Sequence, residues 1–304
     1  MNILQYLLNL FKKQVQVKDY VRPNNTGIIL EPLKPEDFVV GVNSPIVFET
    51  RIKDGNWTPY AWDEENQFSS RGDALDCVAE SFINAVEAQE FFMTGRKVNY
   101  SKRWLAKCSG TNQGVYKGKG NTYANVADWI HNRGLVLESS YPKPSGWTVD
   151  EFYAEINPDL QTKLLAEGQI WLQKWAYDYE YLKVSDPNLD YHLKHSPINI
   201  VIPGHSVCGI YSPDQLMRYL DSYPNPYFKS APVSGLQVAM KGILTSKLIQ
   251  ARQVGWQGSP ELGIYIPADN MERFKFIQDN LPNWIPNYQL DVSKIYVLPT
   301  KKPF

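Results

Sequence analysis

The sequence predicts an α+β fold in which a mostly helical half precedes an antiparallel β-sheet. In the first half, apolar residues recur at helical spacing, most clearly over 74–94, where Val78, Phe82 and Val86 stand at successive i+4 positions. From residue 197 onward the period changes to two, as in Pro197-Ile-Asn-Ile-Val-Ile. Helices followed by strands favour two packed layers, and we expect a functional site where the two halves meet.

The N-terminal stretch predicts an amphipathic helix. Its apolar residues at positions 3, 4, 7, 8, 10 and 11 lie close to one helical face. No basic segment precedes them, no small-residue cleavage site follows, and about eleven residues cannot cross a bilayer, so we expect neither a signal peptide nor a transmembrane segment. The helix is expected to pack on its own domain or on a partner protein, with binding to a membrane surface as the alternative. Residues 1–26 are assigned to this helix and its linker.

The next segments follow from the same patterns. Residues 14–66 are rich in Pro and Asn and hold short β-prone runs that begin at Gly27 and Pro45, which predicts an extended arm or small subdomain. The sequence leaves open whether this arm is inhibitory, lines a substrate groove or serves as an anchor. Helices are predicted over 74–94 (ended by Gly95), 100–108, 123–133 (ended by Gly134) and 150–183, the last interrupted at Asn157-Pro158.

The second half predicts strands over 197–202, 205–211, 215–221 and 235–244. Beyond residue 247, β-prone runs near 262–266 and 294–298 flank a predicted helix over 270–280, a pattern typical of a small β-α-β unit. We therefore divide the chain into a main domain over 27–246 and a C-terminal appendage over 247–304.

Composition excludes several classes of function. A chain of 304 residues that is 43% hydrophobic can bury a full core, and 31 Lys plus Arg against 32 Asp plus Glu give no broad positive field for nucleic acid. Three cysteines without a CxxC pair indicate a reducing compartment or isolated thiols, not a disulfide scaffold or a zinc cage. His192 and His195 are three residues apart but lack a third ligand at metal spacing. No metal or organic cofactor is expected.

Cys77 is the first candidate for chemistry. It falls in the first turn of its predicted helix whether Asp73 or Asp76 is the N-cap, and there the helix dipole favours a thiolate. The Asp76 carboxylate would oppose this if it turned toward the sulfur. A single helical Cys is more often a small buried hydrophobe, so the assignment depends on its neighbours. Cys108 and Cys208 are expected in the core, although Cys208 could react if exposed.

A predicted hairpin supplies two further candidates. If Ser212-Pro213-Asp214 is the turn, residue 211 pairs with 215, 209 with 217, 207 with 219, and His205 with Asp221. His205 and Asp221 then share one face with Cβ atoms about 5 Å apart. A carboxylate on one imidazole nitrogen orients the ring and leaves the other nitrogen to face a thiol. A cross-strand His and Asp alone would more often be a surface pair, but a helix-N-terminal Cys roughly 130 residues upstream favours a catalytic group.

With these residues in view, the chain resembles the papain-like cysteine peptidases encoded in tailed-phage genomes. The resemblance covers residues 27–245 and rests on ordered motifs: DCVAESFINAVE, YSKRWLAKCSGT, the Gly114–Asn121 loop, VADWIHNRGLVLESSYP, and HSVCGIY followed by YLDSYP. It implies a papain-like two-part fold, with Cys77 as nucleophile, His205 as general base and acid, and Asp221 in the role of the family's Asn.

Three positions depart from that family's pattern. The family's CGSCW run around the nucleophile is replaced by Ala-Leu-Asp-Cys-Val. Asp221 keeps an acceptor for the imidazole but adds a charge that should raise the pKa of His205. Arg71 stands where the family has its oxyanion Gln, so Gln67, in Glu65-Asn66-Gln67, is our candidate donor.

These observations predict a phage-encoded cysteine peptidase that hydrolyses peptide or isopeptide bonds through a Cys-His-Asp triad. Its expected partners are a polypeptide or peptide cross-link as substrate and, through the N-terminal helix and the appendage, other virion proteins. Its expected location is the host cytoplasm during synthesis, or the virion. Two alternatives stay open: a virion structural protein on a papain-like scaffold, and a lytic peptidase acting on peptidoglycan cross-links, for which no wall-binding module is recognisable. The sequence indicates neither the cleavage specificity nor the oligomeric state.

Overall fold

The structure is a computed structural model that describes residues 27–34, 37, 50–61, 66–182, 189–223 and 227–247, together with the backbone of two short strands near the C-terminus. The predicted N-terminal helix, the run that begins at Pro45 and the predicted helix 270–280 lie outside the described residues. Within the described part, no helix is long and apolar enough to cross a membrane.

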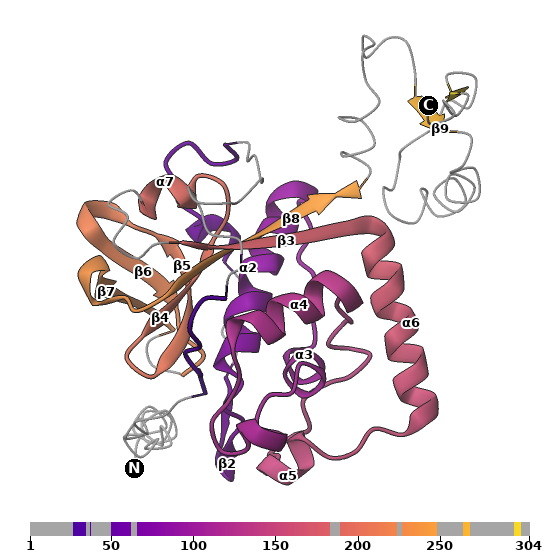
Figure 1. Cartoon of the computed structure of the whole chain (residues 1–304), viewed down its shortest axis with the longest axis vertical. Helices are drawn as coiled ribbons and strands as arrows, with labels where there is room; N and C mark the ends of the chain where they lie inside the picture. The colour runs from indigo at the N-terminus through magenta and orange to yellow at the C-terminus, as the bar shows by residue number, and fades with distance from the viewer. Residues whose placement is uncertain are drawn as a thin grey trace, which may run out of the picture.

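A six-stranded antiparallel sheet and a group of helices form the two halves of the main domain (Figure 1). In spatial order the strands are β3 (Trp175–Leu182), β8 (Ala239–Ser246), β4 (Ile198–Ile202), β5 (His205–Tyr211), β6 (Leu216–Leu220) and β7 (Phe228–Pro232). The helices are α2 (Cys77–Thr94), α3 (Lys102–Cys108), α4 (Tyr123–Arg133), α5 (Val149–Phe152), α6 (Pro158–Lys174) and α7 (Leu189–Leu193). Short pieces complete the list: η1 (Thr58–Tyr60), β1 (Phe68–Ser69), β2 (Gly72–Asp73), η2 (Gly114–Tyr116), η3 (Pro213–Gln215) and η4 (Val233–Gly235).

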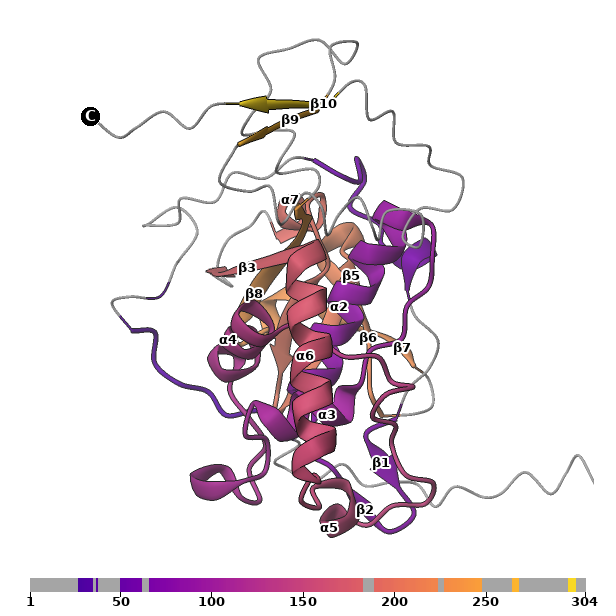
Figure 2. The same ribbon diagram turned by 90° about the vertical axis from the view of Figure 1, so that its right-hand side faces the viewer.

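Helix α2 lies between the sheet and helices α3 and α4 (Figure 2). It begins at Cys77, with Asp76 as N-cap, and ends where Gly95 takes the left-handed conformation at φ 67°, as the sequence predicted. Every residue from Cys77 to Glu90 is buried, because the helix contacts strands on one side and α3 and α4 on the other. A helix buried all round needs polar partners for its charged residues, and Glu87 finds one in the buried Lys102 at 3.2 Å.

The sheet is buried on both faces beside α2. On β4, Val201 joins the apolar cluster that contains Cys77 and Phe82 of α2, whereas Ile198 and Ile200 join a second cluster that contains Trp57 and, from α2, Ala85 and Ala88. All five residues of β4 are buried; four of them are apolar, and the fifth is Asn199.

The predicted elements differ from the structure in one helix and one missed strand. The helix expected over 150–183 ends at Lys174, and residues 175–182 form strand β3. The run Trp175-Ala-Tyr-Asp-Tyr-Glu-Tyr-Leu has strand propensity and pairs with β8 over its whole length, which outweighs the helical reading. Strand β7, which pairs with β6, was not predicted.

The hairpin register also differs from the prediction. Cys208 pairs with Leu220 and Gly209 with Tyr219, and a bulge follows, so that Tyr211 pairs with Arg218. The turn runs through η3, where Asp214 and Gln215 have positive φ. The pairing is therefore displaced by two residues from the predicted one. Because side chains alternate with period two, a two-residue displacement leaves His205 and Asp221 on the same face.

Near the C-terminus, β9 (Ile264–Pro267) and β10 (Ile295–Leu298) pair in parallel. Parallel neighbours require a crossover connection, as a β-α-β unit would supply. The division of the chain at residues 26 and 246 stays a prediction.

Candidate active site

The Cys77 side chain lies at the contact between α2 and β5. Cys77 is the first residue of α2 and is fully buried. Its Sγ accepts a hydrogen bond from the backbone N–H of Ser206, at 3.5 Å between N and Sγ. The Ser206 and Ser81 hydroxyls lie 2.7 Å apart and hold the start of β5 against α2. Leu75, two residues before the thiol, has φ 56°, a conformation that costs energy in a branched residue and is common near functional sites.

His205 is the residue next to Ser206, and its ring contacts Asp221. Its Nε2 lies 2.9 Å from Asp221 Oδ1, with both side chains buried. The same oxygen accepts the backbone N–H of Tyr223 at 2.9 Å, and the Tyr223 ring lies 5.0 Å from the imidazole. The predicted His205–Asp221 contact is therefore present, although the two residues do not pair directly across the hairpin.

Asp221 has a further partner that the sequence did not indicate. Lys229 Nζ, on β7, donates to Asp221 Oδ2 at 2.8 Å. Burial raises the pKa of Asp221, but the hydrogen bond and charge of His205, together with the donors from Lys229 and Tyr223, outweigh it and hold that pKa well below its ordinary value. The carboxylate is ionised, and its charge is offset by an ammonium group. Only the alternation of β7 beside β6 could have indicated Lys229.

Asp76 is a second buried carboxyl beside the thiol, with the opposite behaviour. Neither of its side-chain oxygens has a hydrogen-bond partner among the described residues. Burial raises the pKa of Asp76 well above its ordinary value; the Lys143 charge lowers it less, and Glu80 and Asp73 raise it further. A raised pKa favours the uncharged form of Asp76 and so weakens the opposition to a thiolate that the sequence suggested.

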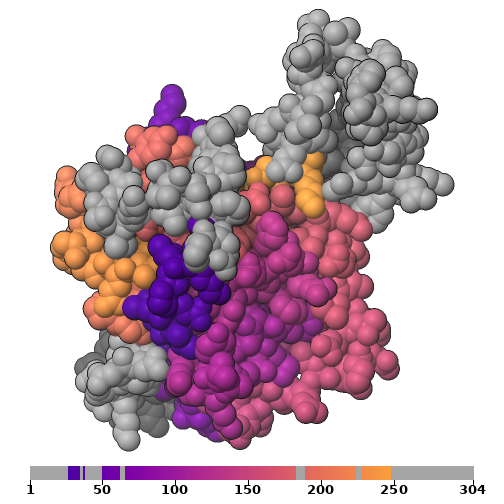
Figure 3. Space-filling view, viewed as in Figure 1, coloured from indigo at the N-terminus to yellow at the C-terminus, as the bar shows by residue number. Residues whose placement is uncertain are grey.

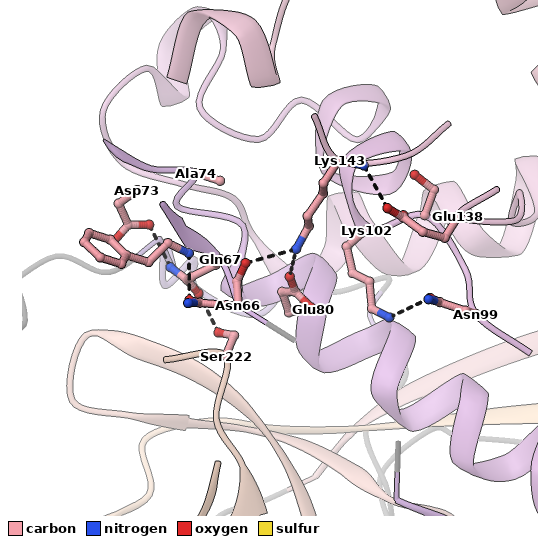
Figure 4. A network of polar contacts seen from close by, with 12 residues as sticks. Asn66, Gln67, Asp73, Ala74, Glu80, Asn99, Lys102, Glu138, Lys143 and Ser222 are labelled. Atoms are coloured by element: carbon pink, nitrogen blue, oxygen red, sulfur yellow. Dashed lines mark hydrogen bonds and ion pairs between the residues drawn. The ribbon is translucent and has the colours of Figure 1, made fainter. Parts of the chain in front are cut away.

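Gln67 lies at the junction of the two halves (Figure 4). Its Nε2 donates to Asp73 Oδ1 and to the Tyr223 hydroxyl, both at 2.9 Å, and its Oε1 accepts from Ser222 Oγ at 2.6 Å. Both amide hydrogens are thus engaged, and an oxyanion would have to displace one acceptor.

The segment that carries Gln67 is fixed from the helical side. Lys143 Nζ donates to the backbone oxygen of Asn66 at 3.3 Å and forms an ion pair with the buried Glu80 of α2 (Figure 4). Arg71, at the family's Gln position, instead pairs with Glu151 at 2.9 Å. Arg71 therefore does not replace a neutral donor at the site.

The arm over residues 27–34 lies between the two halves on one face of the molecule (Figure 3). The Asn121 N–H donates to the Gly27 oxygen at 2.9 Å, and the Ile29 N–H donates to the Asn121 oxygen at 2.8 Å. Gly27 has φ 107°, and a Cβ there would lie 2.3 Å from the Leu75 oxygen. Ile28 belongs to the same apolar cluster as Cys77. The arm is therefore packed against the turn that precedes the thiol.

The other candidate side chains are not brought to this site. Cys208 is buried, and burial raises the pKa of its thiol; Cys108 is partly buried, and burial raises its pKa to about 12. His192 and His195 are buried, not solvated, and His192 Nδ1 lies 3.4 Å from Lys241 Nζ. Over the described ranges, no group of His, Cys, Asp and Glu could hold a metal ion.

The arrangement of strands and helices is similar to that of solved papain-like proteases. Xylellain, a cysteine protease from Xylella fastidiosa, matches with a TM-score of 0.53 and 14% identity, covering 74% of this chain and 98% of that one. The ragweed cysteine protease Amb a 11, in its proform, matches with a TM-score of 0.46 and 16% identity, over 62% of this chain and 66% of that one. Procathepsin L 3 of Tenebrio molitor matches with a TM-score of 0.45 and 16% identity, over 62% and 68%. No protein-family model and no curated protein sequence matches the chain. The fold is papain-like and α+β, as predicted.

Proposed function

We propose that the protein is a cysteine peptidase that hydrolyses peptide or isopeptide bonds with Cys77, His205 and Asp221 as its catalytic triad. One observation carries the proposal. The buried His205 Nε2 lies 2.9 Å from Asp221 Oδ1. The next residue in the chain, Ser206, donates its backbone N–H to Cys77 Sγ, with 3.5 Å between N and Sγ. A thiol at a helix N-terminus next to an oriented imidazole is the arrangement that thiol nucleophiles require.

In the proposed reaction, His205 Nδ1 takes the thiol proton, and the Cys77 thiolate attacks the scissile carbonyl carbon. Asp221 holds Nε2, which leaves Nδ1 as the nitrogen that accepts the thiol proton, and stabilises the imidazolium. The Cys77 backbone N–H and Gln67, after exchange of one of its acceptors, stabilise the oxyanion of the tetrahedral intermediate. His205 then protonates the leaving amine, and water, deprotonated by His205, hydrolyses the thioester and restores the thiol.

The substrate class is a polypeptide or a peptide cross-link. The ordered motifs along residues 27–245 support a tailed-phage origin, and with it virion proteins as partners. An inactive virion scaffold would not need an ionised carboxylate held on the imidazole of a buried His, and the partners of Asp221 therefore favour the enzyme.

The test is covalent labelling with a peptidyl vinyl sulfone or epoxide, followed by intact and peptide mass measurement. We expect one label per chain, on Cys77, and no label or hydrolysis of a denatured protein substrate with Cys77→Ala. The matched controls are Cys108→Ala and Cys208→Ala, which should keep labelling and activity. Hydrolysis by Cys77→Ala at the wild-type rate, or labelling at residue 108 or 208 alone, would disprove the assignment.

A further inference from the structure

Lys229 is a charged group bound to Asp221 that the triad mechanism does not use. Its ammonium group reaches from edge strand β7 to the buried Asp221, with its side chain 27% exposed against 1% for Asp221. We propose that Lys229 is a positioning residue of the active site, which fixes the Asp221 carboxylate and cancels its charge. This inference rests on the proposed function.

The two oxygens of Asp221 have separate partners. Oδ1 lies 2.9 Å from His205 Nε2 and accepts the Tyr223 N–H, while Oδ2 accepts from Lys229 at 2.8 Å. Rotating the carboxylate would break all three contacts at once. The backbone holds the frame, because the Asp221 N–H donates to the Tyr227 oxygen at 2.9 Å. Lys229, bound to Oδ2, thus keeps the carboxylate from rotating and so holds Oδ1 on the imidazole.

Lys229 also sets the charge at the imidazole. Around His205 the described charged and titratable groups are Asp221 with Lys229 behind it, the Tyr223 hydroxyl bound to Asp73, and the Cys77 thiol. An isolated buried carboxylate would strongly favour the imidazolium. With Lys229 in place, the carboxylate and the ammonium together present a neutral acceptor, which is what a neutral amide at position 221 would present without a lysine.

An amide at position 221 is incompatible with Lys229. If the Asn oxygen accepts from His205 and Tyr223, its NH₂ group points at the Lys229 ammonium, and two donors face each other. Asp221→Asn should therefore be impaired only because Lys229 is present. Removing the ammonium, by Lys229→Met, should restore the amide variant.

The experiment compares wild type, Asp221→Asn, Lys229→Met and the double variant by kcat/KM across pH. We expect Asp221→Asn to lose at least about tenfold and the double variant to recover to within about threefold of wild type. Lys229→Met alone should shift the alkaline limb of the kcat/KM profile to higher pH, because the imidazolium of His205 then keeps its proton to higher pH. Arg218→Met, which removes an exposed charge from neighbouring strand β6, is the matched control. It should change neither kcat/KM nor the pH of the alkaline limb.

Two outcomes would overturn the proposal: an Asp221→Asn variant as active as wild type with Lys229 present, or a double variant as poor as the product of the single losses. If the wild type hydrolyses no peptide, the proposed function fails, and the titration of the His205 imidazole by NMR decides this proposal separately. An unchanged His205 pKa in Lys229→Met would then disprove it. Melting temperatures of all four proteins identify any variant that fails to fold.

Discussion

Two buried carboxyl groups flank the candidate site, and their pKa values are shifted in opposite directions. Asp76, before the thiol, is 0% exposed, and Asp221, beside the imidazole, is 1% exposed. Asp221 receives three donors, from His205, Tyr223 and Lys229, whereas neither side-chain oxygen of Asp76 has a hydrogen-bond partner among the described residues. Their pKa values accordingly move in opposite directions, upward for Asp76 because burial dominates and downward for Asp221 because its partners outweigh burial.

The difference teaches that burial alone does not decide whether a carboxyl group is charged; the supply of donors does. For the proposed chemistry both pKa shifts act in the same direction. The raised pKa of Asp76 favours its uncharged form, which weakens the opposition to a thiolate at Cys77, and the ionised Asp221 stabilises the imidazolium of His205. Both carboxyl groups therefore favour transfer of the thiol proton from Cys77 to His205.

The largest expected effect comes from removing the ionised member. Asp221→Ala should lower kcat/KM by about 100-fold, because the imidazole loses the acceptor that orients it. The measurement is steady-state hydrolysis of a denatured protein substrate. Asp150→Ala, an exposed Asp on α5, is the matched control and should keep wild-type activity. Equal rates for Asp221→Ala and wild type would show that residue 221 does not orient the base.

Gln67 links Asp73, before the thiol, to Ser222, which follows Asp221. Its removal should have the next largest effect. Gln67→Ala should lower kcat/KM by about tenfold, because one oxyanion donor and the link from Asp73 to Ser222 are both lost. Ser222→Ala removes one hydrogen bond of the same amide but keeps the donor, and should lower the rate less. A Gln67→Ala variant with normal kcat would limit Gln67 to a structural role.

The arm over residues 27–34, which packs against the turn before Cys77, provides a third test: whether this arm shields the thiol. Gly27→Ala cannot keep its position, because a Cβ would overlap the Leu75 carbonyl and φ is 107°. We expect a loss of about 1–3 kcal/mol in the free energy of unfolding and several-fold faster labelling of Cys77. Gly235→Ala, where a Cβ meets open space, is the control. Unchanged labelling would show that the arm does not shield the thiol.

The smallest effect is expected for Asp76. Asp76→Asn should leave kcat/KM within about twofold at neutral pH, because the raised pKa of Asp76 favours the uncharged carboxyl group, which an amide resembles. A tenfold loss in Asp76→Asn would mean that the ionised form of Asp76 is required for activity, as that of Asp221 is.

The same variant gives a pH dependence of defined sign. The pKa of Asp76 is raised in the folded state, so its contribution to stability is complete below the unfolded pKa of about 3.9 and is lost as pH rises. Wild type should therefore lose stability relative to Asp76→Asn in urea unfolding as the pH rises above about 4. Asp221, whose pKa is lowered, contributes stability above about pH 4 and should give the opposite slope against Asp221→Ala.

Local patterns predicted much of the fold. The apolar spacing and Gly95 predicted α2 with Cys77 in its first turn, and Gly134 predicted the end of α4. The alternation over 205–211 predicted β5, residue for residue. The failures came where local signals conflict, as in 175–182, where pairing with β8 determines the structure.

The sequence by itself determined that Cys77 lies in the first turn of a helix and that His205 and Asp221 share a face, since helix caps and strand alternation act within a few residues. Alternation has period two, so even a register wrong by two residues kept the two side chains together. Only the tertiary structure decided that Lys229 holds Asp221, that Gln67 is bound by Asp73 and Ser222, and that Asp76 has no donor. The physical reason is that the charge of a buried group depends on donors from distant segments, and no local pattern encodes which of these segments meet.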